Sequence, residues 1–324
     1  MTRTIARHGE MAESLSFAER FARWRRKHRQ PIEAWLILSP ILLYYSIFFI
    51  FPVVANILVS FTRWTGVYDS PVWVGLDNYK AYLKPPYPIT LFNTVLFTVV
   101  ILAVQTTLAF FMAVLLNEKV IGRGVYRVMW YVPTLTSAAI TAQVFFSFIS
   151  PYDGVFNAVL KALGQPMVIW TMKAGWMRAF IIMYSVWRGV GMPMVLFLAA
   201  LQGIHPEIYQ AAMVDGADYW RLLRHITIPL LRPMVIFILI TGTIAGFQVF
   251  ETVMLITAGG QYSVASSGGP RNMTNVLLLQ IYKDAFVSLN LGRAAAGSMI
   301  AALILLWFTS TNMRIMSRGQ VGKE

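Results

Sequence analysis

Cysteine is absent from the 324 residues, and charged residues make up only 13% of them. The first absence excludes disulfides, thiol nucleophiles and cysteine-based metal sites. The second is about half the share of charged residues in soluble domains, which is roughly 25%. So few charges could not cover a soluble fold of this length, in which 57% of residues are hydrophobic. The composition therefore predicts a protein that lies partly in lipid.

Other absences limit the chemistry. The four histidines are scattered and form no His-x-x-His or His-Glu-x-x-His pair, so no metal site is predicted. No Gly-x4-Gly-Lys-Ser/Thr phosphate loop occurs, so the chain is not expected to bind a nucleotide in the usual way. The formal charge of +13 could suggest a nucleic-acid partner, and the distribution of the basic residues decides this question.

Charge-free runs are the most informative feature that is present. Four of them have 20 or more residues, and two have 18. A membrane-spanning helix needs about 20 mostly apolar residues and satisfies its own backbone hydrogen bonds in lipid. The sequence predicts an all-α membrane protein with six spans, at about 36–62, 89–116, 128–149, 179–201, 230–252 and 294–313.

Basic residues are distributed unevenly about these spans. The two ends together with 117–127 and 203–232 hold 17 Lys and Arg, whereas 63–88, 150–178 and 251–293 hold nine. Cytoplasmic segments of membrane proteins carry the excess of Lys and Arg, so both termini are predicted in the cytoplasm. This sidedness explains the net charge without a nucleic acid. Pro, Gly and Asn in the three outer segments are typical of irregular loops.

The two ends flank a predicted transmembrane domain, residues 34–316. In the basic segment 1–33, apolar residues recur at helical spacing between Met11 and Ala22. This pattern is typical of an amphipathic helix in the membrane interface, and a disordered basic tail is an equal alternative. A cleavable signal peptide is not expected, because the following apolar run exceeds a normal h-region. Residues 317–324 are expected to form a cytoplasmic tail.

The predicted cytoplasmic loop at 203–229 has an unusual composition. Pro206 suits the first turn of a helix, and Gly216 can end that helix in a left-handed conformation. Asp218 can cap a second short helix, Tyr219–His225, before Pro229 restarts the chain into span five. Several large apolar side chains also occur here: Tyr209, Met213, Tyr219, Trp220, Leu222 and Leu223. Such a patch usually marks a surface for another protein, although the loop could pack on its own membrane domain instead.

This loop resembles the EAA loop of binding-protein-dependent ABC importer permeases. The family pattern is Glu-Ala-Ala, three residues, Gly, nine residues and Ile-x-Leu-Pro. The chain has Gln210-Ala211-Ala212, Gly216 and Ile226-Thr227-Ile228-Pro229 at the same spacing, and Val214-Asp215-Gly216-Ala217 has the form common in the carbohydrate branch. Gln210 replaces the usual Glu, which puts an ion pair from this position in doubt. The amide itself, or Glu207, could stand in for it.

The resemblance to maltose- and glycerol-phosphate-type permeases extends over about 36–318. It includes Phe51-Pro52, Val74-Gly75-Leu76-Asp77-Asn78-Tyr79, Gly122-Arg123-Gly124-Val125-Tyr126-Arg127 and Phe250–Gly260. It implies a type I ABC importer permease fold, a multi-pass protein of the bacterial inner membrane, and import of sugars or oligosaccharides. It also implies partners, namely a second permease in a heterodimer, two ATPase subunits that bind ATP and Mg, and a periplasmic or lipid-anchored solute-binding protein.

The resemblance further implies that the loop is a coupling helix seated in an ATPase cleft. The chain is then a transport subunit and not an enzyme. The residues expected to couple it to the ATPase are Glu207, Tyr209, Gln210, Ala211, Ala212, Asp215 and Gly216.

Polar residues inside the predicted spans are candidates for the substrate path. Arg188 is the clearest, because an Arg at the centre of a membrane helix costs about 2.5–3.5 kcal/mol on insertion scales. Tyr184, Arg188 and Gly191 share one helix face, and Gln248 and Glu251 share another. The candidates chosen for a sugar path are Tyr184, Trp187, Arg188, Gln248 and Glu251. Arg188 could instead snorkel or form a structural ion pair with Glu251. Gln105, Asn93 and Gln143 are weaker candidates, since single amides often join helices.

The charge of the outer segments suggests a substrate class. They are net positive, which suits an anionic sugar such as a uronate oligosaccharide and a permease of the alginate-importer kind. Neutral malto-oligosaccharides, trehalose and glycerol phosphate remain open. An ion-coupled secondary transporter is the main alternative, but it predicts an inverted repeat and acidic groups deep in the spans. A membrane enzyme would need convergent carboxylates, whereas Asp215 and Asp218 lie inside the EAA loop.

Overall fold

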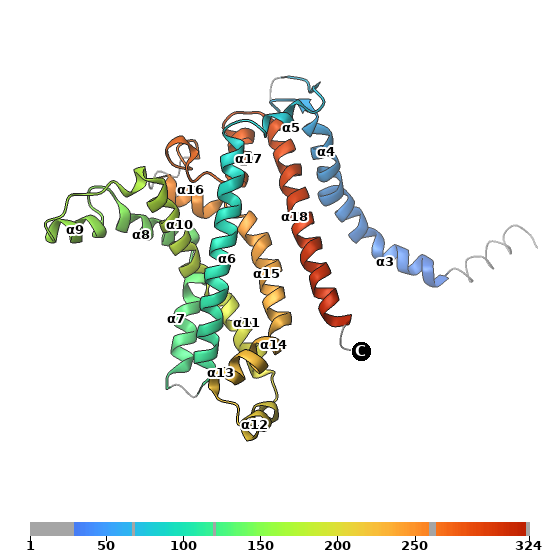
Figure 1. The fold of residues 1–324 in the computed structure, drawn as a ribbon. Coiled ribbons are helices and arrows are strands. Elements are labelled where there is room, and N and C mark those ends of the chain that lie inside the picture. Colours follow the sequence, from blue (N-terminus) through green and yellow to red (C-terminus); the bar gives the residue numbers. More distant parts are fainter. Residues whose placement is uncertain (1–28, 67–68, 119–120, 259–263, 322–324) are drawn as a thin grey trace, which may run out of the picture. The chain divides into compact units, whose positions relative to one another are not determined.

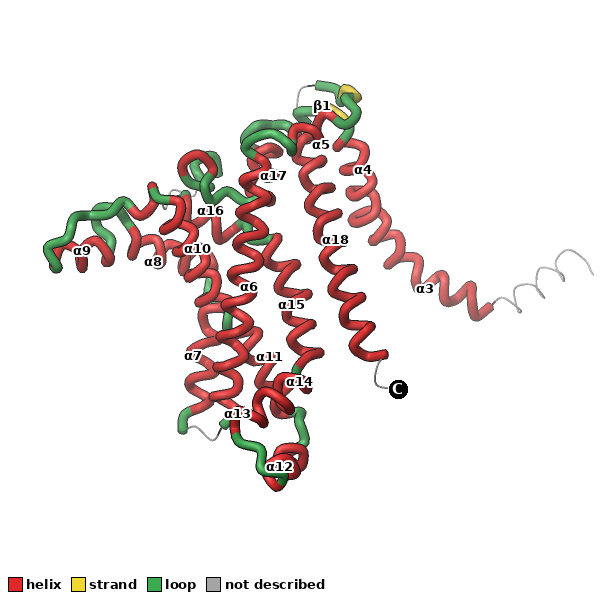
Figure 2. Tube along the Cα trace, in the orientation of Figure 1, coloured by secondary structure: helices red, strands yellow, loops and turns green. Residues whose placement is uncertain are grey.

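The computed structural model describes residues 29–66, 69–118, 121–258 and 264–321. Helices dominate this part of the chain, as the ribbon in Figure 1 and the tube in Figure 2 show. The chain divides into two units, residues 1–58 and 59–324. The amphipathic helix considered for the first residues falls within 1–28, outside the described part.

The first unit contains one interrupted helix. α3 (Arg29–Tyr45) continues through the π-helical turn η1 (Ser46–Ile50) into α4 (Phe51–Ser60). The π turn ends two residues before Pro52, which has no N–H to donate, and local π adjustments satisfy the backbone groups that such a proline leaves free. Every side chain of residues 33–54 is exposed, although most are apolar. A helix that is apolar on all sides requires lipid or another protein around it.

The second unit begins with the last two residues of α4, followed by a small hairpin and then by helices. β1 (Thr62–Arg63) pairs antiparallel with β2 (Val72–Trp73), so Thr62 lies in a strand and not in the predicted first span. The elements that follow are α5 (Asp77–Ala81), α6 (Tyr87–Asn117), α7 (Arg123–Leu135), α8 (Ala138–Ile149), α9 (Val155–Ala162), η2 (Trp170–Met172), α10 (Ala174–Gly189), α11 (Gly191–Gln202), α12 (Pro206–Val214), α13 (Tyr219–Leu222), η3 (Leu223–Thr227), α14 (Ile228–Leu230), α15 (Arg232–Phe247), α16 (Glu251–Thr257), η4 (Pro270–Asn272), α17 (Leu277–Phe286) and α18 (Leu291–Val321).

The predicted spans 128–149 and 179–201 are bent helix pairs, and a third bent pair joins the end of the predicted cytoplasmic loop to the helix of span five. α7 and α8 meet at 98°, α10 and α11 at 43°, and the helical stretch Tyr219–Leu230 meets α15 at 60°. Among the described residues, three helices are long and apolar enough to cross a membrane, and up to six spans result if each bent pair is one span. The predicted number of six spans is compatible with the helices and stays a prediction. α18 continues to Val321, so the beginning of the expected cytoplasmic tail is helical, and its location stays a prediction.

Local features accompany two of these bends. Between α7 and α8, Thr136 and Ser137 have extended backbone angles, just after Pro133. Between α10 and α11, a side chain on Gly191 would place its Cβ only 2.4 Å from the carbonyl oxygen of Trp130. The glycine therefore lets α11 approach the backbone of α7 closely, and the two helices pack together in the second unit.

In the second unit, we call the end of the helices that lies opposite α12 the distal end; α5, α17 and the beginnings of α6 and α18 lie there (Figure 1). The segment 251–293, expected as an irregular loop, instead forms α16 and α17 and contributes buried residues to the core. Asp284 of α17 is buried and accepts hydrogen bonds from Tyr87 Oη (3.0 Å), Tyr82 Oη (3.5 Å) and Gln280 Nε2 (2.9 Å). The two tyrosine bonds fix α17 to the end of α5 and the beginning of α6, whereas the bond from Gln280 lies within α17.

The buried carboxyl group of Asp284 gives a testable pH dependence. Burial raises the pKa of Asp284 above its ordinary value of 3.8, more than its hydrogen bonds lower it. The folded state therefore binds this proton more tightly than the unfolded state. The resulting stabilisation is complete below pH 3.8 and is lost as the pH rises through the folded-state pKa. Asp284→Asn should make thermal stability less dependent on pH, measured by melting curves of the purified chain in detergent.

Asp153→Asn is the matched control, because Asp153 is exposed and lies in the turn before α9. It should leave the pH dependence of the melting temperature as in the wild type. Equal pH profiles for Asp284→Asn and the wild type would contradict the assignment to Asp284.

Candidate functional site

The loop that resembles an EAA loop folds as two short helices joined at Gly216. Pro206 is the first residue of α12, and Asp215 follows its end. Gly216 has φ +78°, and the N–H of Ala217 donates to the carbonyl of Ala212 over 2.9 Å, which closes the helix end. Asp218 caps α13 by accepting from the N–H of Arg221 over 2.8 Å. Both predicted helix ends are confirmed.

The loop differs from the sequence prediction at Pro229. The chain does not restart there, because the helix runs on from α13 through the π turn η3 into α14. Pro229 follows a π turn at the same distance as Pro52 does in the first unit, so both prolines are accommodated in the same way. The break falls at Leu231, just before α15, whose first turn contains Pro233.

The two faces of α12 have different environments. Tyr209 and Ala212 are half-buried, and Tyr209 Oη lies 3.2 Å from the hydroxyl of Thr227 in η3. The opposite face is exposed and consists of Glu207, Ile208, Gln210, Ala211 and Val214, with Asp215 and Gly216 beyond it. Tyr209 and Ala212 thus hold α12 against its own loop, while the other coupling candidates lie on the free face.

The apolar side chains of this loop divide in the same way. Leu223 is buried and Leu222 half-buried, as expected if the loop packs on its own domain. Val214 is 88% exposed and Trp220 69% exposed, and Met213 and Tyr219 are exposed as well. A soluble surface seldom carries such a cluster unless something covers it. The described loop therefore has both a packed face and an apolar face available for a partner.

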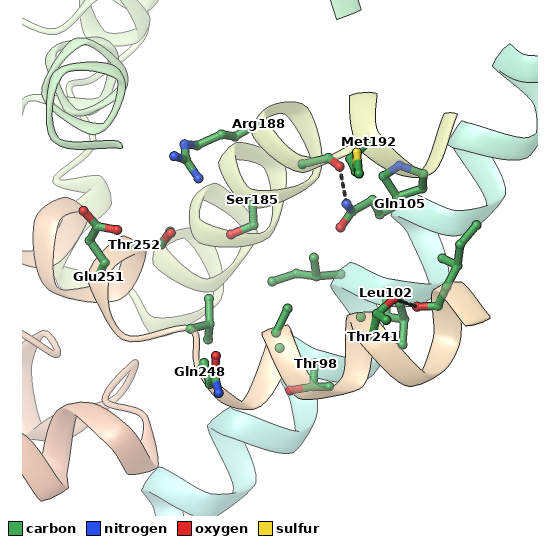
Figure 3. Close-up of a pocket in the computed structure, with 18 of the residues that line it drawn as sticks. Thr98, Leu102, Gln105, Ser185, Arg188, Met192, Thr241, Gln248, Glu251 and Thr252 are labelled. Carbon is green, nitrogen blue, oxygen red and sulfur yellow. Dashed lines mark hydrogen bonds between the residues drawn. The ribbon is translucent and has the colours of Figure 1, made fainter. Parts of the chain in front are cut away.

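A second feature is a cavity of about 440 Å³ between α6, α10, α11 and the α15–α16 junction. Its wall is mainly apolar and carries a few polar groups. Figure 3 shows side chains from these elements around the opening. The polar residues that line it are Thr98, Gln105, Ser185, Arg188, Thr241, Gln248, Glu251 and Thr252. An apolar wall with few polar groups is typical of small-molecule sites.

Arg188 and Glu251 bring one positive and one negative charge to this cavity. Arg188 donates one long hydrogen bond, of 3.4 Å, to the carbonyl of Thr136, and its buried Nε has no partner within the described structure. Within the described structure, no ion pair joins Arg188 to Glu251. Figure 3 shows Arg188 extending from α10 toward the side of the cavity where Glu251 begins α16. Arg188 is therefore available to a ligand.

Three of the five substrate-path candidates come together, and two do not. Gln248, Arg188 and Glu251 line the cavity, whereas Tyr184 and Trp187 do not. Tyr184 is fully buried against α8, with its hydroxyl 2.8 Å from that of Thr141 and 3.1 Å from the carbonyl of Ala138. Tyr184 thus holds α10 to α8.

The expected shared face of Gln248 and Glu251 is not that of one helix. Gln248 follows the end of α15, and Glu251 begins α16, so the helix breaks between them. They meet the same cavity because the chain turns there. The prediction that Gln248 and Glu251 lie together is therefore correct, but the reason given for it, a shared face of one helix, is not.

Sequence reasoning undervalued Gln105 and missed several hydroxyl residues. Gln105 lines the cavity while its amide donates to the carbonyl of Gly189, so it also joins α6 to α10. The hydroxyl of Thr98 is buried without a partner within the described structure, and Ser185 lines the cavity beside Arg188. Of the other weak candidates, Asn93 donates to the carbonyl of Asn275 over 2.8 Å, and Gln143 is exposed. The position of a Ser or Thr in an apolar run gives no signal that it faces a cavity.

A helical chain with apolar helices of membrane length and a partly polar cavity between them is typical of membrane transport proteins. Its fold is that of a solved ABC importer permease chain. The crystal structure of a bacterial ABC transporter involved in the import of the acidic polysaccharide alginate contains a chain that matches 91% of this one with a TM-score of 0.77. The match covers 99% of that chain at 22% sequence identity.

Sequence comparison gives the family. The model of the binding-protein-dependent transport system inner membrane component family matches residues 105–319, and this chain belongs to that family. The lactose transport system permease protein LacF of Rhizobium radiobacter is 33% identical over 80% of this chain and 85% of its own length. The trehalose/maltose transport system permease protein MalF of Thermococcus litoralis is 32% identical over 89% and 95%. Members are ABC transporter permease subunits, which confirms that the chain is an inner-membrane transport component and not an enzyme.

Proposed function

We propose that the chain is one of two permease subunits in an ATP-driven importer of sugars or oligosaccharides that depends on a solute-binding protein. The relatives named above transport sugars, and a solved relative of similar fold is in complex with an alginate pentasaccharide-bound periplasmic protein. The cavity beside Arg188, Gln248 and Glu251 is the substrate passage.

ATP hydrolysis is supplied by two separate ATPase subunits, which bind ATP and Mg. The observation that carries this assignment is the exposed face of α12. It presents Gln210, Ala211 and Val214 on a short helix that its own domain does not cover. The small side chain of Ala211 allows close approach of a partner backbone. Nucleotide-driven closure of the ATPases would move α12, and with it α13 and the helices that follow.

The orientation follows from charge. The end of the second unit that carries α12 faces the cytoplasm, together with both termini, because the basic residues concentrate in these segments. The distal end then faces outward, where a solute-binding protein would deliver its ligand.

An anionic sugar, such as a uronate oligosaccharide, is the substrate class that the cavity supports best. The supporting observation is the buried Nε of Arg188, which has no partner within the described structure. A carboxylate of the substrate would supply that partner, and charge-assisted hydrogen bonds of this kind are about twice as strong as neutral ones.

The proposal is tested by purifying the tagged full-length chain from its native membrane. A second EAA-containing permease and an ATPase with a phosphate loop should co-purify with it. The complex, reconstituted in vesicles, should take up oligosaccharide only with ATP and the binding protein present. Uptake by the chain alone, driven by an ion gradient, would instead support a secondary transporter.

A further inference from the structure

A second cavity, of about 370 Å³, lies at the distal end of the second unit and is strongly basic. Lys80 of α5 and Lys84, three residues after that helix, form one wall. Tyr87 at the beginning of α6 and Arg293 in the first turn of α18 form the other. One carboxylate, that of Asp77, lies among these three cations, 3.1 Å from Lys80. The lining is therefore net positive, and the proposed transport mechanism makes no use of it.

Arg293 is held in place but has unused hydrogen-bond donors. Its backbone N–H donates to Asn290 Oδ1 over 3.1 Å, and its carbonyl accepts over 3.2 Å from Tyr82 Oη, whose one hydrogen is shared with Asp284. The guanidinium makes one long contact, 3.4 Å from Nη1 to Tyr87 Oη, and its buried Nε has no partner within the described structure. Tyr87 Oη donates its own hydrogen to Asp284 over 3.0 Å and so presents a lone pair to Arg293.

The Nε–H of Arg293 has no hydrogen-bond acceptor within the described structure. In the part of the chain that the structure describes, no direct ion pair joins Asp284 to Arg293, although their charges attract each other across Tyr87, and Asp77 is engaged by Lys80. A guanidinium with a free donor beside two ammonium groups is the donor set that binds a phosphate or another oxyanion.

The level of the cavity along the membrane-spanning helices indicates the source of the oxyanion. α6 and α18 are both long and apolar enough to cross a membrane. Tyr87 is the first residue of α6 and Arg293 is the third of α18, so both lie where these helices leave the apolar layer. Phospholipid headgroups occupy this level, and their phosphates are oxyanions that the planar donor fork of an Arg matches.

We propose that the cavity formed by Lys80, Lys84, Tyr87 and Arg293 binds the phosphate of an anionic phospholipid headgroup. The lipid ties α5 and the beginnings of α6 and α18 together at the membrane surface. A free phosphate ion would satisfy the same donors, so the experiment has to distinguish the two sources.

The test uses the full-length chain with the subunits that co-purify with it, in detergent, with phosphatidylglycerol, phosphatidylcholine and inorganic phosphate as probes. Native mass spectrometry should find one tightly retained phosphatidylglycerol for each copy, with phosphatidylcholine retained more weakly. The double variant Lys80→Gln/Lys84→Gln should weaken this retention by about fivefold for each cation removed. Arg293→Gln should do the same.

Lys161→Gln/Lys173→Gln is the charge-matched control, because both lysines are exposed in the segment 150–178, outside the cavity. It should retain the lipid as the wild type does. Since Arg293→Gln could loosen the packing of α18, the double lysine variant decides the result. Equal retention by the two double variants would overturn the proposal. Binding of inorganic phosphate in place of lipid would overturn the lipid source and identify a free-oxyanion site.

Discussion

Val214→Glu is expected to abolish ATP-driven uptake while the chain still accumulates in the membrane. Val214 is the last residue of α12 and is 88% exposed, so the substitution removes no packing within the chain. In the proposed complex this side chain is covered by the ATPase, and an unpaired carboxylate buried there costs several kcal/mol. Because about 1.4 kcal/mol is a factor of ten in affinity, the ATPase should be lost by well over tenfold. Uptake by membrane vesicles and recovery of the ATPase with the tagged chain measure the effect.

Ile121→Glu is the matched control. Ile121 precedes α7, lies outside α12 and is 96% exposed. The same change of an exposed aliphatic residue to glutamate there should leave both the ATPase and the uptake in place. If Val214→Glu retained the ATPase and transported like Ile121→Glu, the docking role of α12 would be wrong.

The long helices could be predicted from the sequence, but their bends could not. Charge-free apolar runs report that a segment prefers lipid, and α6 and α18 follow them closely. Hydropathy carries no information on the direction of a helix axis, so the 98° bend between α7 and α8 could not be seen within one apolar run. Pro133 was the available signal, yet prolines in membrane helices produce anything from no bend to a full break.

α17 was missed for a different physical reason. Its sequence contains Gln280, Lys283 and Asp284, which read as a solvated loop. Asp284 is buried because Tyr82 and Tyr87, about 200 positions away in the sequence, supply hydrogen bonds. Local patterns cannot reveal such distant partners. The α12 loop was predicted well because its helix ends depend on neighbours within a few residues, such as Asp218 and Arg221.

Helical spacing was a partial guide to the cavity. It put Tyr184 and Arg188 on one face, yet Tyr184 packs on α8 while Arg188 lines the cavity. One face of a helix is wide enough to meet two neighbours. Ser185 was overlooked because a serine in any helix can donate its hydroxyl to the carbonyl four residues earlier, and therefore gives no signal in the sequence. Ser185 does so with Ile181, over 2.7 Å. Arg188 could be found because a charge in an apolar run has no such local solution.

Arg188→Gln should weaken transport of a uronate oligosaccharide about tenfold or more, since a hydrogen bond to a charged group contributes roughly 1.5–3 kcal/mol. Glutamine keeps the aliphatic part of the side chain and loses only one long hydrogen bond within the chain, that to the carbonyl of Thr136, so the fold should be retained. Glu251→Gln removes the negative charge from the same cavity and should change anionic uptake in the opposite direction. A neutral oligosaccharide of the same length should respond weakly to both variants. The concentration dependence of uptake in the reconstituted complex, measured for each variant with each of the two sugars and compared with the wild type, gives the four changes needed.

The opposite signs separate an electrostatic role from a steric one. A residue that only shapes the passage would affect charged and neutral sugars alike, and Arg188→Lys would then be as harmful as Arg188→Gln. With a carboxylate as ligand, Arg188→Lys should restore part of the anionic uptake, because the charge remains while the planar fork of donors is lost. A preference for neutral sugars in the wild type, unchanged by Arg188→Gln, would remove the anionic substrate from the proposal. It would leave Arg188 as a residue that joins α10 to Thr136, the residue that follows α7.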